Sequence, residues 1–157
     1  MGQLDNITVI ITGAAQGIGA AYARGLAAEG CNVIVNDVLD PAPLVSEIKA
    51  AGGEARGIVA DVTDDIQISE MIAEVIETYG RIDGLINNAF LNHAKNQTKN
   101  GKNSLETFPI EVWNTSLELN LTAVFLCCQE FGKIMAKQKK GVIVNISSIY
   151  GMSGVDQ

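Results

Sequence analysis

The chain alternates short apolar runs with longer segments in which apolar residues recur about every 3.6 positions. The short runs are rich in β-branched residues, which is typical of strands buried on both faces. The longer segments carry the apolar stripe of helices that cover a sheet. Most changes between the two fall at turns that contain glycine or proline. The expected strands are residues 7–12, 32–38, 55–60, 85–89 and 142–146, and the expected helices are residues 16–29, 44–51, 64–79 and 109–137.

Regular alternation of strand and helix predicts an α/β fold. Parallel strands need crossover connections, and helices that return over the sheet provide them in the right-handed sense. We therefore expect a Rossmann-type, doubly wound parallel sheet of order 3-2-1-4-5, in three layers (α/β/α), with residues 1–157 in a single domain. Residues 121–128 are apolar nearly all round, which predicts that this part of the last helix is covered on two sides.

Composition and charge exclude several kinds of protein. The 157 residues are 47% hydrophobic and 18% charged, which is typical of a globular domain and not of a disordered chain. A net charge of −7 would repel nucleic acid. The longest apolar stretch, residues 121–128, is far shorter than the roughly 20 residues that cross a bilayer. His93 is the only histidine and has no cysteine or carboxylate cluster at ligand spacing, so no metal site is expected.

The cysteines and the start of the chain indicate the compartment. Cys31, Cys127 and Cys128 form no CxxC pattern and, being three, cannot all pair internally. No charged and apolar leader with a cleavage site opens the chain. We expect buried, reduced thiols in a cytoplasmic protein.

A glycine-rich turn joins the first strand to the first helix. Without side chains, its glycines let backbone N–H groups approach a pyrophosphate and let the helix N-terminus face the negative charge. The spacing is GxxxGxG and not GxGxxG, so the turn alone would also fit a role in packing only. The surrounding strand, helix and following acid favour a dinucleotide site. The expected contacts are Gly13, Gln16, Gly17, Ile18 and Gly19.

Asp37 ends the second strand about 20 residues after this turn, where a carboxylate can accept both ribose hydroxyls of NAD and repel a 2′-phosphate. A solvated turn aspartate is the alternative. Gln16 is neutral where a basic residue would favour the phosphate. The sequence therefore favours NAD over NADP in an NAD(P)-binding domain.

Five motifs together resemble the N-terminal portion of a classical short-chain dehydrogenase/reductase. They follow one another in the order and with the spacing of that family, and they cover the whole chain. The motifs are residues 12–19, Asp61-Val62, Asn87-Asn88-Ala89, Asn120 within Leu119-Asn120-Leu121, and residues 141–148.

The resemblance implies roles for the residues of these motifs. Asp61 and Val62 would hold the adenine. Asn88 and Ala89 would line the cofactor near the nicotinamide ribose. The implied activity is hydride transfer between nicotinamide and an alcohol or ketone.

The same resemblance implies two catalytic residues. Ser148 would donate a hydrogen bond to the substrate carbonyl, and a hydroxyl donor aimed at a developing alkoxide stabilises it electrostatically. Ser147 could be confused with it, but the family pattern favours the second serine. Asn120 would hold a water in a proton relay, and this role is compatible with Asn120 tying the helix backbone to a neighbouring strand.

Two departures from the family pattern matter. Phe90 stands where the Asn-Asn-Ala-Gly motif has glycine, beside the expected nicotinamide position. The family's Tyr-x-x-x-Lys pair, in which tyrosine is the general acid/base, should follow the serine by about a dozen residues and is absent. Tyr22, Tyr79 and Tyr150 all lack a lysine four positions later. We therefore expect a chain truncated before this segment, without the C-terminal strands and helices.

A weaker resemblance concerns the substrate. Residues 87–151 are similar to bacterial family members linked to flagellin or surface-sugar modification, which suggests a sugar hydroxyl in place of acyl or small polyol ketones. The alternatives to an enzyme are a non-catalytic dinucleotide-binding module and an incomplete gene product. The full-length form is expected to be a homo-oligomer, a dimer or tetramer.

The absent acid/base pair generates a first prediction. A general acid/base group supplies about 10²- to 10⁴-fold of the rate, so the 157-residue chain should show no more than trace dehydrogenase turnover at saturating NAD. The assay follows NADH absorbance with candidate alcohols and ketones. Robust turnover that Ser148→Ala abolishes would contradict the expectation and require another proton-transferring group.

Overall fold

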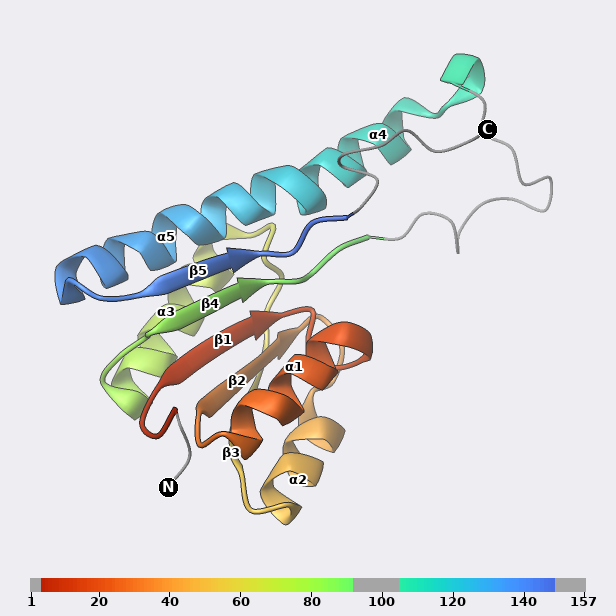
Figure 1. Cartoon of the computed structure of the whole chain (residues 1–157). Helices are drawn as coiled ribbons and strands as arrows, with labels where there is room; N and C mark the ends of the chain where they lie inside the picture. The colour runs from red at the N-terminus through yellow and green to blue at the C-terminus, as the bar shows by residue number, and fades with distance from the viewer. Residues whose placement is uncertain (1–3, 92–104, 149–157) are drawn as a thin grey trace.

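The computed structural model describes residues 4–91 and 105–148. Within them the chain forms a parallel sheet of order β3-β2-β1-β4-β5, which confirms the predicted topology (Figure 1). In the register of the central strands, Ile10 lies opposite Ile34 on one side and Leu85 on the other. The strands are β1 Thr8–Thr12, β2 Asn32–Asp37, β3 Glu54–Val59, β4 Gly84–Asn87 and β5 Val142–Asn145.

Helices cover both faces of this sheet, so the three-layer arrangement is also confirmed. Helices α1 (Gly17–Ala28) and α2 (Ala42–Ala50) lie on one face. Helices α3 (Asp65–Tyr79) and α5 (Ala123–Gln138) lie on the other (Figure 1). The predicted bounds coincide with these or differ by at most two residues, as is usual for helix and strand ends.

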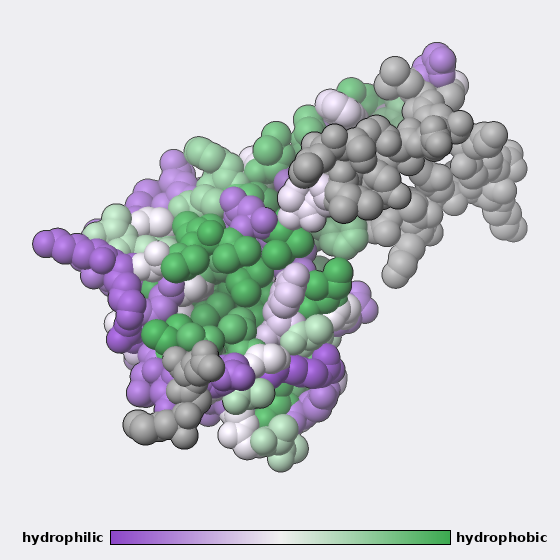
Figure 2. All heavy atoms as spheres, in the orientation of Figure 1, coloured by the Kyte–Doolittle hydropathy of each residue, from purple (hydrophilic) through white to green (hydrophobic). Residues whose placement is uncertain are grey.

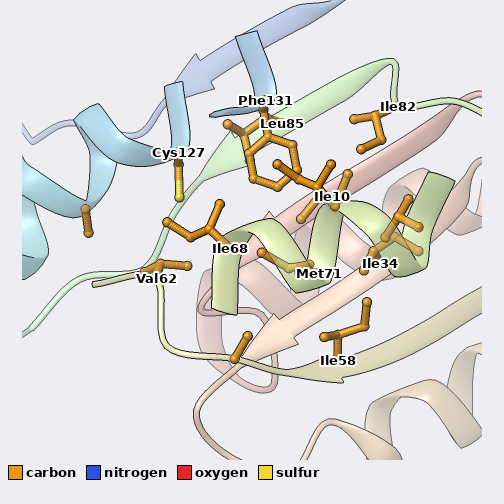
Figure 3. Close-up of a cluster of buried hydrophobic side chains, with 14 of the residues drawn as sticks. Ile10, Ile34, Ile58, Val62, Ile68, Met71, Ile82, Leu85, Cys127 and Phe131 are labelled. Carbon is orange, nitrogen blue, oxygen red and sulfur yellow. The ribbon is translucent and has the colours of Figure 1, made fainter. Parts of the chain in front are cut away.

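The core divides into two clusters because successive side chains of a strand point to opposite faces. Val9 and Ile11 of β1 pack against α1 and α2. Ile10, between them, belongs to the cluster under α3 and α5, where Met71 and Phe131 are also buried (Figure 3). Strand β1 is thus buried on both faces, as its continuous apolar sequence predicts.

Helix α3 begins and ends at residues suited to those positions. Asp64 caps its N-terminus, and its carboxylate accepts the N–H groups of Ile66 and Gln67. Gly80 ends it with φ of 72°, a left-handed conformation that glycine adopts without a steric penalty.

The predicted helix over residues 109–137 is present, but it is not uniform. Helix α4 (Ile110–Leu117) passes into a π-helical turn, η3 (Glu118–Thr122), and then into α5. The hydroxyls of Thr115 and Ser116 donate to carbonyls four residues earlier, an interaction that often bends helices. Apolar periodicity carries no signal for such a turn.

The prediction that residues 121–128 are covered on two sides is wrong for the described part of the chain. Ala123 and Cys127 face the sheet and are buried, whereas Leu121 is 63% exposed and Phe125 60%. Residues four apart share one helix face, so a single contact with the sheet buries only one stripe.

Helices α1 and α2 cover one face of the sheet but do not extend over strand β5, which is therefore uncovered on that face. Val142 is 63% exposed there, and Val144 and Ile146 are exposed on the same side. Figure 2 shows hydrophobic side chains gathered over this part of the sheet. The outer face of an apolar strand, which a doubly wound fold normally buries, is thus open to solvent among the described residues.

Most of residues 90–102, a polar segment that follows β4, lies outside the described residues. Among the residues that the structure does describe, no helix is long and apolar enough to span a membrane.

The uncovered apolar surface predicts self-association. At about 25 cal/mol per Å², roughly a few hundred Å² of apolar surface removed from water is worth several kcal/mol, comparable with the net stability of a domain. The 157-residue chain should therefore aggregate or fold loosely, sediment as several species and bind a hydrophobic dye.

Phe125→Gln should reduce this association, whereas Ile66→Gln, at an equally exposed position on α3, should change it little. Analytical ultracentrifugation of the three chains makes the comparison. A sharp, reversible melt from a monodisperse monomer of the unsubstituted chain would contradict the prediction.

Candidate cofactor-binding site

A cavity of about 690 Å³ opens at the carboxyl ends of β1, β2, β3 and β4. It lies where the strand order reverses, between β1 and β4, which is the position where open α/β sheets bind ligands. Helical residues of α4 and η3 form part of its wall. Most of the site residues expected from the sequence line it, namely Gly13, Gln16, Gly17, Ile18, Asp37, Asp61, Val62, Asn88 and Ala89.

The glycine turn and the end of β4 approach each other too closely for side chains. A Cβ added at Gly13 would lie 2.7 Å from the Cα of Ala89. One added at Gly19 would lie 2.5 Å from the Gly13 carbonyl oxygen and 2.6 Å from Nδ2 of Asn88. Gly19 therefore does not line the cavity but supports the turn that does.

Hydrogen bonds lock this approach. Nδ2 of Asn88 donates to the carbonyl oxygens of Thr12 (2.9 Å) and Gly13 (3.0 Å). In return, Oγ1 of Thr12 accepts the N–H groups of Asn88 and Ala89, both at 3.0 Å. Thr12 was not among the expected site residues, although it stands in the first motif. The sequence feature that could have identified Thr12 is a hydroxyl side chain at the last position of a buried apolar strand.

The N-terminus of α1 faces the cavity without a side-chain cap. Gln16 occupies the N-cap position, but its side chain makes no capping hydrogen bond, and the first turn contains no acid. Gly17, with φ of 62°, has a backbone conformation that favours glycine. An uncapped helix N-terminus carries partial positive charge and N–H groups that can bind an anion.

Asp37 lies at the end of β2 and is nearly buried, so the alternative of a solvated turn aspartate does not describe it. One carboxylate oxygen accepts the N–H of Ala15 at 2.9 Å, and the other accepts the N–H of Leu39 at 3.1 Å. Each oxygen keeps a further lone pair for another donor. The carboxylate is therefore fixed in orientation beside the glycine turn.

The charges around the cavity are all of one sign. Asp37, Asp61 and Glu118 line it, whereas the described lining residues include no lysine, arginine or histidine. Such a site opposes any ligand group of high negative charge that the helix N-terminus does not reach.

The two expected catalytic residues lie outside the cavity lining. Asn120 is in η3, and its Oδ1 accepts the N–H of Leu91, a lining residue, at 3.1 Å. This bond ties the helix to the segment that follows β4. Ser148 follows β5 and is exposed at the end of the described residues.

Several lining residues escaped the sequence analysis. They are apolar or uncharged for the most part and come from loops and helix turns, which periodicity does not place. These residues are Val38, Leu39, Thr63, Leu91, Thr115, Glu118 and Leu119. Phe90, expected beside the nicotinamide, also lines the cavity and is largely exposed.

The thiols of α5 are poor candidates for chemistry. Burial, together with the neighbouring Cys128, raises the pKa of Cys127 to about 12, so its reactive thiolate is scarce at neutral pH. The described residues include no group of three histidine, cysteine or acidic side chains that could hold a metal ion.

Comparisons with known proteins agree with this geometry. A profile of the family described as short chain dehydrogenase matches residues 7–157. The chain is 38% identical to 3-oxoacyl-acyl-carrier-protein reductase of Synechocystis sp., over 92% of this chain and 57% of that protein. It is 39% identical to the reductase of the same name from Staphylococcus epidermidis, over 95% of this chain and 59% of that protein. The chain thus spans less than three fifths of the length of these relatives.

Solved structures share the fold. A metagenomic short-chain oxidoreductase in complex with NADP has a TM-score of 0.85 at 34% identity, over 97% of this chain and 66% of that one.

The close approach at Gly19 generates a prediction with an internal control. Gly19→Ala should lower the free energy of unfolding by about 1–3 kcal/mol, because its Cβ would overlap backbone that cannot move away. Gly25→Ala, in the same helix with open space around it, should be neutral or stabilising by about 0.5–1 kcal/mol.

Urea unfolding, followed by circular dichroism in chains that also carry Phe125→Gln, measures the difference. Equal stability of the two alanine variants would show that the turn and β4 are not in this contact.

Proposed function

Because the chain belongs to the short-chain dehydrogenase family, we propose that it binds NAD as part of an oxidoreductase that acts on an alcohol or a ketone. The observation that carries the proposal is the glycine cradle at the uncapped N-terminus of α1, with the fixed Asp37 carboxylate beside it. In this proposal residues 1–157 are the NAD(P)-binding domain.

The residues of the cavity suit the parts of a dinucleotide. The N–H groups at the start of α1 would bind the pyrophosphate, which needs the space left by the absent side chains of the turn. Asp37 would accept the hydroxyls of the adenosine ribose. Asp61 and Val62 would contact the adenine, and Asn88 and Ala89 the nicotinamide side.

NAD is favoured over NADP by the charges at the site. A 2′-phosphate on the ribose would meet the carboxylate of Asp37, and no described lining residue offers a cation to balance it. The similar metagenomic oxidoreductase was solved with NADP, so the fold itself does not decide between the two cofactors.

When bound, the nicotinamide supplies or receives the hydride. Ser148 would donate a hydrogen bond to the substrate oxygen and stabilise the charge that develops on it. Asn120 would hold a water through groups that its bond to Leu91 leaves free. Because Ser148 and Asn120 do not line the cavity, both roles require the substrate and the water to bind outside it, next to these two residues.

The substrate belongs to the alcohols and ketones. The names of the two reductases to which the chain is similar support an acyl ketone. The weaker sequence resemblance to sugar-modifying members supports a hydroxylated substrate, and Thr115 and Glu118 provide polar groups in the wall for one. Phe90 would border either substrate.

The setting of the protein is part of the proposal. The described thiols are free, and those of Cys31 and Cys127 are buried, which suits the reducing cytoplasm. The net charge of −7 disfavours nucleic acid as a partner. A homo-oligomer, dimer or tetramer, is proposed for the full-length form, and the apolar surface at Leu121 and Phe125 is compatible with it.

Cofactor choice is the test of this proposal. The chain should bind NADH more tightly than NADPH, and Asp37→Ala should narrow the ratio of the two dissociation constants by roughly tenfold or more. Cofactor fluorescence, titrated in the Phe125→Gln background to limit association, gives both constants.

Asp40→Ala is the matched control, because it removes an exposed carboxylate three residues away that does not line the cavity. It should leave the ratio unchanged. Tighter binding of NADPH by the chain that retains Asp37 would overturn the NAD assignment.

A further inference from the structure

We propose that Gln67 is a positioning residue for cofactor recognition: it holds the loop of Asp61 so that this carboxylate accepts the 6-amino group of adenine. The inference rests on the proposed function. It concerns a helix residue outside the cavity lining, and it follows from the hydrogen bonds that join the start of α3 to the end of β3.

Gln67 occupies the third position of α3, where glutamine ordinarily completes a capping box. In that motif its side chain accepts the N–H of the N-cap residue. Here the N-cap is Asp64, but its N–H donates to the carbonyl oxygen of Asp61 at 3.1 Å. Oε1 of Gln67 instead accepts the N–H of Asp61 at 2.9 Å. The capping side chain is thus diverted from the helix end to the loop that lines the cavity.

The other end of the Gln67 amide is fixed as well. Its Nε2 donates to Oδ2 of Asp64 at 2.8 Å. Oδ1 of Asp64 meanwhile accepts the N–H groups of Ile66 and Gln67. These hydrogen bonds lower the pKa of Asp64 and keep the capping carboxylate ionised. The bond from the Gln67 side chain contributes most. The amide of Gln67 therefore bridges the rigid helix terminus and Asp61, with both of its polar atoms engaged.

The Asp61 carboxylate has one oxygen committed and one available. Oδ1 accepts the N–H of Thr63 at 2.9 Å and its hydroxyl at 2.8 Å. Among the described residues no donor reaches Oδ2, although Asp61 lines the cavity. A carboxylate is an acceptor only, and the 6-amino group of adenine is a donor. With its backbone held by Gln67 and one oxygen held by Thr63, the remaining oxygen has a defined position.

A purely structural role for Gln67 makes a different prediction. If the side chain only stabilised α3, its loss would weaken every ligand of the folded chain equally. If it positions Asp61, its loss would weaken specifically the contact with the adenine amino group. The two can be separated with deamino-NADH, in which an oxygen acceptor replaces the 6-amino group and the neighbouring ring nitrogen N1 becomes a donor, while the riboses, pyrophosphate and nicotinamide are unchanged.

The experiment compares the dissociation constants of NADH and deamino-NADH by cofactor fluorescence, in the 157-residue chain carrying Phe125→Gln. The chain with Gln67 should prefer NADH by about tenfold or more, as expected for a hydrogen bond to a charged group. Gln67→Ala should bring the two constants within about threefold by weakening NADH.

Two further variants separate positioning from helix stability. Gln67→Glu keeps an acceptor for the Asp61 N–H but sets a carboxylate, in place of the amide donor, against that of Asp64, so it should retain only part of the preference. Asp65→Asn removes the acid of the first turn of α3, which favours the helix through its dipole, and should lower stability without changing the preference.

Equal weakening of both cofactors by Gln67→Ala, or no preference for NADH in the chain with Gln67, would overturn the inference while leaving dinucleotide binding intact. Failure of that chain to bind either cofactor would overturn the proposed function and the inference together.

Discussion

The close contact between the glycine turn and the end of β4 is the constraint on which the site depends. Gly13 and Gly19 leave no room for a Cβ against Ala89, Asn88 and the turn itself. Asn88 and Thr12 then exchange hydrogen bonds across the contact. Because α1 starts at this turn, the contact fixes where the helix N-terminus points. A side chain at either glycine would overlap the opposing backbone, so the turn or the start of α1 would have to shift.

A second set of constraints fixes the carboxylates at the neighbouring strand ends. Asp37 is held by N–H groups of Ala15 and Leu39, and Asp61 is held through Thr63 and Gln67. Both acids are therefore held in fixed positions in the cavity wall. Hydrogen-bond acceptors that are held in place lose little conformational entropy when they bind a ligand, and such preorganisation favours affinity and selectivity.

Local patterns predicted the fold well, because strand and helix periodicity and the caps of α3 are encoded within a few residues. The site residues of the glycine turn and of strand ends were accessible for the same reason, since parallel strands bring their carboxyl ends to one edge. Contacts between distant residues were not accessible: Asn88 meets Thr12 across 76 positions, and Ala15 meets Asp37 across 22. Nor does periodicity show the π-helical turn η3 or the exposure of Leu121.

The central claim is that the cavity at the carboxyl ends of the strands holds a dinucleotide. An amide N–H correlation spectrum of the chain carrying Phe125→Gln, recorded during titration with NAD, tests it most directly. The account predicts shifts for the amides of residues 16–18, 37–39 and 61–63, which line the cavity, and little change for Gly53 and Asp83 at the amino ends of the strands. Shifts concentrated at the amino ends, or none at saturating NAD, would contradict it.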